Sequence, residues 1–182
     1  MAKYEIKSPL TGEIEIISKH AHMLYHIIHK EKIRRIMEVG LWRGHLAQEI
    51  LSSSCKHIVE EYWGIDPWLP MPYHNITDSR MSRFDPDGSL GKWEEVYWYC
   101  AKMMVDFPQL RVLRMTSLDA ARIFKGKQYF DLVFIDASHK YKDVLADIRA
   151  WTPLTSNVVS GHDYMNGRKQ HEGVTQAIHE SF

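Results

Sequence analysis

The chain has 182 residues, of which 45% are hydrophobic and 25% charged, with 23 basic and 23 acidic side chains. This composition is typical of one globular domain and excludes a disordered chain. The formal net charge of zero gives no indication of a nucleic-acid or membrane partner. Because no helix-length apolar run or secretory signal is evident, we expect a single-domain cytoplasmic protein over residues 1–182.

Cysteine and histidine content bears on metal and disulfide chemistry. Cys55 and Cys100 are the only cysteines, too few for a disulfide framework, so both are predicted to be reduced and at least partly buried. Four of the 11 histidines fall in one helical stretch: His20, His22, His26 and His29. An exposed helix face is the favoured interpretation, with a metal site as the alternative.

Residues 1–32 are predicted to form an N-terminal arm and a helix. The segment GEIEIIS alternates and favours a short edge strand or an irregular arm. His22 to Lys32 has apolar residues at helical spacing, so a helix should precede the core formed by residues 33–182.

The segment from Ile36 to Ile50 predicts a strand, a glycine turn and a helix. An apolar run ends at Val39, and Gly40 and Gly44 enclose the turn. Glycines allow a ligand to approach the backbone closely, and a helix N-terminus offers unpaired N–H groups. The spacing is not the G-x-G-x-x-G pattern of dinucleotide-binding proteins, which disfavours an oxidoreductase.

A second strand is predicted to end at Asp66, where a carboxylate could accept hydrogen bonds from ribose hydroxyls. Pro67 to Lys92 then forms the longest irregular stretch, whose aromatic content favours a lid or a substrate wall. A helix over Trp93 to Phe107 and a strand over Leu110 to Leu113 are expected next, and Thr116 or Ser117 is suited to cap a following helix.

The segment YFDLVFIDASHKYKDVLADIRAW, from Tyr129 to Trp151, predicts a buried strand that ends at Asp136 and a helix after it. A fifth strand, Asn157 to Ser160, leads to Gly161-His162-Asp163-Tyr164. Because parallel strands open into the ligand crevice at their carboxyl ends, Asp136 is expected in the same pocket as Gly40 and Asp66. Asp136, His162 and Asp163 together could hold Mg²⁺, and because His162 departs from an all-oxygen shell, Mn²⁺, Fe²⁺, Zn²⁺ or no metal at all are the alternatives.

These motifs in this order resemble the small class I S-adenosylmethionine-dependent methyltransferases related to macrocin-type natural-product O-methyltransferases. The resemblance covers Ile33 to Phe182 and is carried by Glu38-Val-Gly40-x-x-x-Gly44, Gly64-Ile-Asp66, Phe134-Ile-Asp136-Ala-Ser-His139-x-Tyr141 and Gly161-His162-Asp163-Tyr164. It implies an α/β Rossmann-like doubly wound sheet with strand order 3-2-1-4-5 and S-adenosylmethionine as methyl donor. A divalent cation often binds the substrate hydroxyls in this family.

The resemblance also implies roles for individual residues. The predicted cofactor-binding residues are Glu38, Gly40, Gly44, Asp66, Ser117, Leu118 and Asp136, with Ser117 and Leu118 beside adenine. The predicted metal ligands are Asp136, His162 and Asp163. His139 is the candidate general base, with Asp136 as its catalytic partner, because an imidazole titrates near neutral pH.

The chain departs from the family in one predicted respect, since it ends at Phe182 where the family continues into a hairpin of a sixth and a seventh strand. We therefore expect a sheet without that hairpin and with an exposed fifth strand, which leaves a homo-oligomer open. The favoured function is O-methylation of a small-molecule or sugar hydroxyl. The alternatives are a non-catalytic or truncated cofactor-binding module and an N- or glycan methyltransferase.

Overall fold

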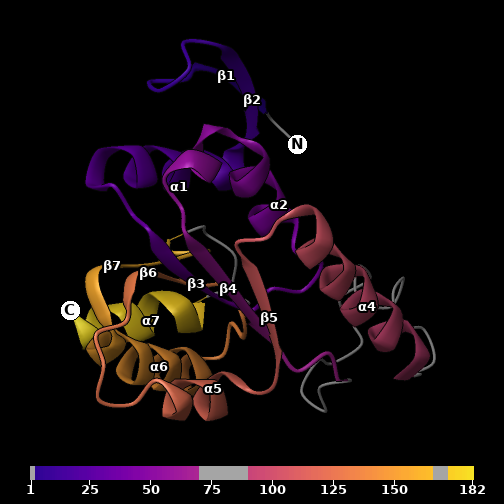
Figure 1. Ribbon diagram of the computed structural model, residues 1–182. Coiled ribbons are helices and arrows are strands. Elements are labelled where there is room, and N and C mark those ends of the chain that lie inside the picture. Colours follow the sequence, from indigo (N-terminus) through magenta and orange to yellow (C-terminus); the bar gives the residue numbers. More distant parts are fainter. Residues whose placement is uncertain (1–2, 70–89, 166–171) are drawn as a thin grey trace.

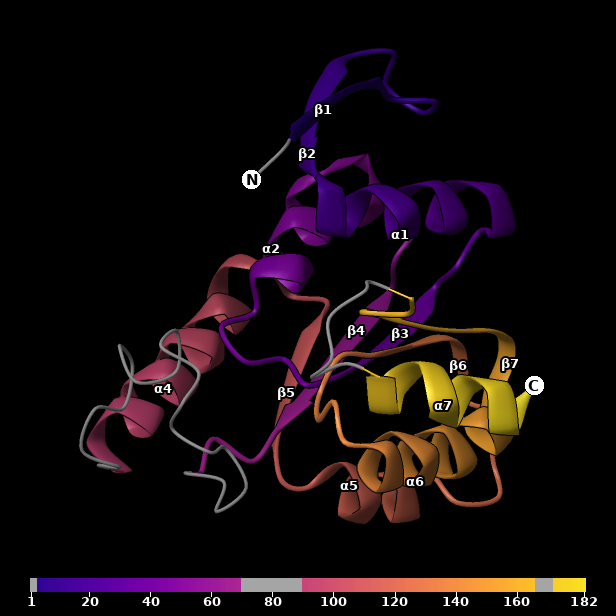
Figure 2. The same ribbon diagram turned by 180° about the vertical axis from the view of Figure 1, so that it is seen from behind.

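The computed structural model describes residues 3–69, 90–165 and 172–182, and its centre is a twisted parallel sheet with helices on both faces (Figures 1 and 2). The strand order is β5-β4-β3-β6-β7, and every neighbouring pair in this sheet is parallel. The sheet strands are β3 (Arg35–Val39), β4 (Glu61–Asp66), β5 (Leu110–Arg114), β6 (Phe130–Ile135) and β7 (Thr155–Gly161).

Each face of the sheet has its own layer of helices and its own core. Helices α1 (Lys19–Glu31), α2 (His45–Ser52) and α4 (Leu90–Asp106) cover one face, and α5 (Ser117–Ile123), α6 (Tyr141–Trp151) and α7 (Glu172–Ser181) cover the other (Figure 1). Short 3-10 turns, η1 (Ser54–His57) and η2 (Thr152–Leu154), precede β4 and β7. Residues of β3 alternate between the cores, with Ile36 in the first and Met37 and Val39 in the second, as the two-residue period of a strand requires.

The topology fixes where a ligand site can form. The chain leaves β3 toward β4 and β5, then returns to place β6 on the other side of β3. The direction of winding therefore reverses between β3 and β6, and in open α/β sheets ligands bind at the carboxyl ends of the strands beside such a reversal. The turns after Val39 and Ile135 lie at this point.

The N-terminal arm folds as an antiparallel hairpin of β1 (Lys3–Lys7) and β2 (Ile14–Ser18), which projects from the body of the molecule (Figure 2). Ile17 is buried, and the Ser18 hydroxyl caps α1 by accepting from the backbone N–H of Ala21 while it donates to Glu49. The sequence had indicated one strand or an irregular arm here. The sequence analysis did not assign β1, although Tyr4 and Ile6 alternate with polar residues in it, because a run of five mostly exposed residues is a weak strand signal without its partner β2.

The expectation that the fold lacks a sixth and a seventh strand is wrong. In the described part of the chain β6 and β7 are both present, paired in parallel at one side of the sheet. They are the strands predicted before Asp136 and over Asn157 to Ser160, and their numbers are higher because β1 and β2 of the N-terminal hairpin precede the sheet in the chain. The core therefore contains all five parallel strands, and β6 and β7 position the residues that follow them.

Candidate active site

The glycine turn after β3 packs directly against the end of β6. Gly40 has φ 97°, and a Cβ built on it would lie only 2.3 Å from the backbone oxygen of Asp136. The backbone N–H groups of Gly40 and Leu41 both donate to the carbonyl of Ile65, at 2.9 and 3.0 Å. Gly44, with φ 66°, is the N-cap residue of α2. Only glycine satisfies both the conformation and the close approach at residue 40.

Asp66 lies at the carboxyl end of β4 with its carboxylate turned toward this loop. Its two oxygens accept the backbone N–H groups of Trp42, at 3.0 Å, and Trp68, at 2.8 Å. Burial raises the pKa of Asp66, although these two hydrogen bonds act in the opposite direction. Each carboxylate oxygen can accept more than one hydrogen bond, so the group retains capacity for a ligand hydroxyl.

Glu38 occupies a different environment from the other predicted cofactor-binding residues. Its side chain is 4% exposed and accepts a 2.7 Å hydrogen bond from the hydroxyl of Tyr62, inside the core beneath α1 and α2. Burial raises the pKa of Glu38 to about 8, so the carboxyl is mostly protonated at neutral pH. Its predicted contact with a cofactor remains a prediction.

Ser117 and Leu118 begin α5 beyond the end of β5, as predicted, with Thr116 as the helix cap. The Ser117 hydroxyl donates to Asp147 at 2.5 Å and accepts from the indole N–H of Trp151 at 2.9 Å, so this side chain joins α5 to α6. Leu118 is exposed.

Asp147 is a buried acid that the sequence interpretation missed. Burial raises its pKa to about 6, and the hydrogen bond from Ser117 acts in the opposite direction. The available signal was its position in a helix beside the buried Ile148 and Val144, where a carboxylate needs a polar partner.

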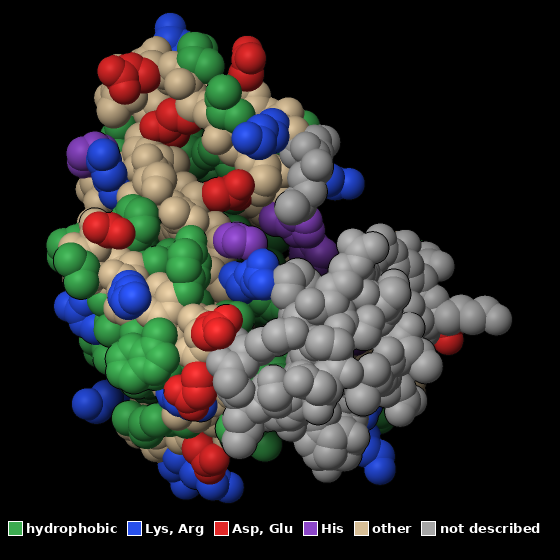
Figure 3. Space-filling view, turned by 90° about the vertical axis from the view of Figure 1, so that its right-hand side faces the viewer, with side chains coloured by type: hydrophobic (Ala, Val, Ile, Leu, Met, Phe, Trp, Pro, Cys, Tyr) green, Lys and Arg blue, Asp and Glu red, His purple; other side chains and the backbone are tan. Residues whose placement is uncertain are grey.

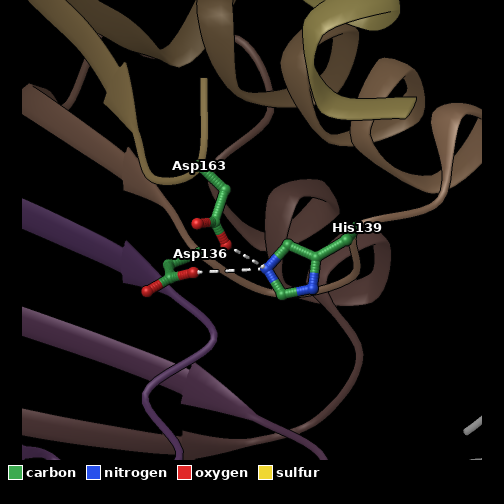
Figure 4. A group of neighbouring side chains, drawn as sticks. All are labelled: Asp136, His139 and Asp163. Carbon is green, nitrogen blue, oxygen red and sulfur yellow. Dashed lines mark ion pairs between the residues drawn. The ribbon is translucent and has the colours of Figure 1, made fainter. Parts of the chain in front are cut away.

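Three predicted residues meet at the carboxyl ends of β6 and β7. Asp136 follows β6, His139 lies in the next turn, and Asp163 follows β7 with φ 63°. The Nε2 atom of His139 lies 2.9 Å from Oδ2 of Asp163 and 3.8 Å from Oδ1 of Asp136 (Figure 4). One ligand atom from each residue lies within 4.8 Å of the others, and all three side chains are partly exposed. Among the described residues this is the one such group of three or more.

Charge and packing fix His139 in this cluster. The neighbouring carboxylates, Asp136 foremost, raise the pKa of His139, although burial acts in the opposite direction. The start of α7 supports the turn from behind, because a Cβ built on Gly173 would lie 2.8 Å from the backbone oxygen of His139. Ser138 donates to Asp143 at 2.7 Å, which closes the turn onto α6.

His162, the third predicted metal ligand, lies at the border of the cluster. Its Nδ1 atom is 3.1 Å from Oδ1 of Asp163 and 4.0 Å from Oδ1 of Asp136. Its ring stacks on that of His20 from α1, with centroids 4.7 Å apart and an interplanar angle of 28°. The group with short mutual distances therefore contains His139 in addition to the two aspartates, whereas His162 contacts it from the side of α1.

Histidine side chains are grouped near the middle of the face shown in Figure 3, with both basic and acidic side chains beside them. The predicted lid or substrate wall falls largely on residues 70–89, which lie outside the described residues. Cys55 and Cys100 are free and buried, as predicted, and burial raises the pKa of each thiol to about 12.

The profile of a family described as a methyltransferase domain matches residues 37–164. The match includes the end of β3 with its glycine turn, Asp66, and the cluster at the ends of β6 and β7. The chain belongs to this family. It is therefore an S-adenosylmethionine-dependent methyltransferase, and the macrocin-type relationship within that class remains a prediction.

Several solved structures share the fold. A proposed caffeoyl-CoA O-methyltransferase from Staphylococcus aureus is 14% identical with a TM-score of 0.60, over 91% of this chain and 74% of that chain. A second structure is that of the O-methyltransferase TomG from Streptomyces achromogenes, which is involved in tomaymycin synthesis and was solved with S-adenosylmethionine. It is 15% identical with a TM-score of 0.57, over 91% of this chain and 69% of that chain. An O-methyltransferase from Bacillus cereus, solved with S-adenosylhomocysteine, is 14% identical with a TM-score of 0.53, over 90% of this chain and 69% of that chain.

At these identities the likeness establishes the fold alone. None of the curated proteins matches the sequence. In the described part of the chain, no helix has the length and apolar character needed to span a membrane.

Proposed function

We propose that this methyltransferase transfers the donor methyl group to a hydroxyl oxygen of a small molecule or sugar, with a divalent cation held by Asp136, His139 and Asp163. The observation that carries the proposal is the adjacency of two sites. The donor turn at Gly40 is in backbone contact with Asp136, and Asp136 is also a member of the cation cluster. Donor and acceptor chemistry would therefore meet at the carboxyl ends of β3 and β6.

The residues after β3 and β4 fit S-adenosylmethionine. The absence of a side chain at Gly40 leaves the backbone open to close approach, and the N-terminus of α2 follows at Gly44. Asp66 is held by two backbone N–H groups with lone pairs to spare, which suits it to the ribose hydroxyls. Methyl transfer at a sulfonium carbon requires mainly alignment of the two reactants, so a rigid turn is the main contribution of this part of the chain.

The donor set of the cluster fits a divalent cation. Two carboxylates and one imidazole are acceptable to Mn²⁺, Fe²⁺, Zn²⁺ and, through the carboxylates, Mg²⁺. When bound, such a cation lowers the pKa of a coordinated hydroxyl and so favours its reaction as an oxygen nucleophile.

His139 can act either as a metal ligand or as a general base. With the cation bound, His139 is a ligand, because its Nε2 atom belongs to the group of close ligand atoms. Without the cation, Asp136 and Asp163 hold a proton on the imidazole instead, and its raised pKa makes His139 a base only at pH above that value. The proposal assigns His139 to the cation, and His162 remains beside Asp163 as a neighbouring imidazole.

The donor site is tested by calorimetric titration with S-adenosylhomocysteine. Asp66→Ala should weaken binding by about 1.5–3 kcal/mol, roughly 10- to 150-fold, because it removes charge-assisted hydrogen bonds. Asp106→Ala, a change of an exposed acid at the end of α4, is the matched control. Unchanged affinity in the Asp66 variant would remove Asp66 from the donor site.

The acceptor chemistry is tested by donor consumption across a panel of vicinal diols, sugars and amines, with and without a chelator. We expect turnover of hydroxylated acceptors that chelator abolishes and Mn²⁺ or Mg²⁺ restores. Asp136→Asn should abolish the metal-dependent turnover while leaving the folded state intact by circular dichroism. Turnover of amines alone, or turnover insensitive to chelator, contradicts the proposal; saturable donor binding without consumption of any acceptor favours the non-catalytic alternative.

The remaining predictions concern the surroundings of the site. The acceptor is a small molecule in this proposal, and residues around 67–92 are predicted to determine which one. The cytoplasmic location and the homo-oligomer both stay predictions. Sedimentation of the purified chain tests whether it forms a homo-oligomer.

A further inference from the structure

A second group of histidines lies on α1, apart from the residues of the candidate active site. His22 and His26 are one helical turn apart, and their Nε2 atoms are 3.3 Å from each other. His26 is exposed and His22 is half-buried. Residues four positions apart in a helix project from the same face, so both imidazoles are available to one ligand.

The separation of the two nitrogens restricts what can lie between them. Two neutral imidazoles at this distance share a proton, with one ring as donor and the other as acceptor. The same separation arises when both nitrogens bind one metal ion, because Zn–N bonds of about 2.0–2.1 Å at a tetrahedral angle place the nitrogens roughly 3.3–3.4 Å apart. A metal could therefore replace the shared proton without movement of the helix.

Packing around the two rings holds them in this arrangement. The ring of Tyr4, from β1, lies against His22 with centroids 4.4 Å apart, and the rings of His22 and His26 meet edge to face at 4.7 Å and 79°. Tyr25, which is fully buried, contacts His26 edge to face at 5.6 Å. These contacts restrict the rotamers of both side chains, which lowers the conformational entropy lost on binding.

We propose that His22 and His26 form a surface binding site for a late first-row divalent cation, namely Cu²⁺, Ni²⁺ or Zn²⁺. Imidazole nitrogen suits these ions, whereas Mg²⁺ prefers oxygen ligands. Among the described residues no third histidine, cysteine or acid joins the pair closely enough to complete a protein-only site. Water occupies the other positions, and the expected order of affinity places Cu²⁺ above Ni²⁺ and Zn²⁺.

The proposed site differs in chemistry from the cluster of Asp136, His139 and Asp163. Its ligands come from one helix and are imidazoles alone, whereas the cluster joins two strand ends and contains two carboxylates. A metal on α1 also stabilises the folded chain, since it binds a geometry that the unfolded chain lacks. Binding should therefore raise the melting temperature and should be measurable without an acceptor substrate.

The test is competition with a chromophoric chelator, using Cu²⁺, Ni²⁺ and Zn²⁺ on the full chain. His22→Gln and His26→Gln should each remove one equivalent of bound Cu²⁺ or weaken it more than tenfold, and should abolish the corresponding rise in melting temperature. His57→Gln, a change of an exposed histidine in η1, is the matched control and should bind as the parent chain does. Asp136→Asn should leave this equivalent in place, which separates it from the cluster.

Either of two results with the variants overturns the proposal. One is an unchanged stoichiometry and affinity in both the His22 and His26 variants, and the other is an equal loss in the His57 control. Melting curves of the metal-free variants show whether each remains folded, so a loss of binding through unfolding is recognised as such. A preference for Mg²⁺ over Cu²⁺ at this equivalent would also contradict an imidazole site.

Discussion

At the scale of single residues, Gly40 is the position where the fold and the candidate site depend most directly on one another. Its positive φ excludes most side chains on conformational grounds, and its contact with Asp136 excludes them on steric grounds. Gly126 shares the first property, with φ 83°, but a Cβ there would meet nothing within 4 Å. Substitution of Gly126 therefore measures the cost of backbone strain alone, whereas substitution of Gly40 adds the cost of the steric clash.

Gly126→Ala should lower the free energy of unfolding by about 1–2 kcal/mol, the cost of a left-handed conformation for alanine. Gly40→Ala should lower it by more than this, because the methyl group also displaces the turn at Asp136. It should in addition abolish saturable binding of S-adenosylhomocysteine, which the Gly126 variant retains. Urea denaturation and calorimetry measure both effects, and equal losses of stability in the two variants would argue against the close packing.

The sequence predicted the position of many site residues because strand ends and glycine turns are local features. Asp136 and Asp163 follow apolar strands, and parallel pairing brings such ends together. The side-chain environment was less accessible to prediction. The burial of Glu38 against Tyr62 and the bonding of Ser117 to Asp147 depend on partners far away in the chain, which no local pattern identifies.

At the scale of elements, α7 is the support for the turn that contains His139. Gly173 lies so close to this turn that a Cβ would approach the backbone nitrogen of Tyr141 to 2.6 Å. Alanine is the better helix former, by at most about 1 kcal/mol in the first turn of α7, so propensity and packing oppose each other at this position. The contact is with backbone, which cannot move away cheaply, and packing should therefore dominate.

Gly173→Ala is accordingly expected to lower the free energy of unfolding by about 1–3 kcal/mol and to weaken Mn²⁺ binding at the cluster as the turn shifts. Gln176→Ala, at an exposed position of the same helix, is the matched control and should change neither quantity appreciably. Thermal denaturation and Mn²⁺ titration provide the measurements. A more stable Gly173 variant with unaltered Mn²⁺ affinity would show that α7 does not restrain His139.

Elements were predicted well where an apolar periodicity defines them and poorly where it does not. The helix expected from His22 begins earlier, at Lys19, because Ser18 supplies a cap that hydrophobic spacing does not register. The N-terminal hairpin was missed because the pairing of β1 with β2 is a property of the folded chain, and the absence of β6 and β7 was wrongly inferred from the point where a family pattern continues.

At the scale of the whole molecule, two buried carboxyl groups on opposite faces of the sheet make stability depend on pH. The pKa of Glu38 is raised from 4.5 to about 8, and that of Asp147 from 3.8 to about 6. Between each pair of values the folded chain binds more protons than the unfolded chain, so the free energy of unfolding falls as pH rises. The raised pKa of His139 acts in the same direction.

By about pH 6, most of the loss of stability that comes from ionisation of Asp147 has already occurred. Ionisation of Glu38 should therefore dominate the further fall in the free energy of unfolding up to about pH 8. We expect the parent chain to lose about 2 kcal/mol of stability between these pH values, at about 1.4 kcal/mol per unit of pKa difference. Glu38→Gln preserves an acceptor for the Tyr62 hydroxyl and removes the titrating group, so its stability should vary much less over the same interval. Urea denaturation at both pH values measures the two slopes. Equal slopes in the parent chain and the variant would mean that Glu38 is already ionised in the folded state at pH 6. The hydrogen bond from Tyr62 would then outweigh the effect of burial on the pKa of this carboxyl.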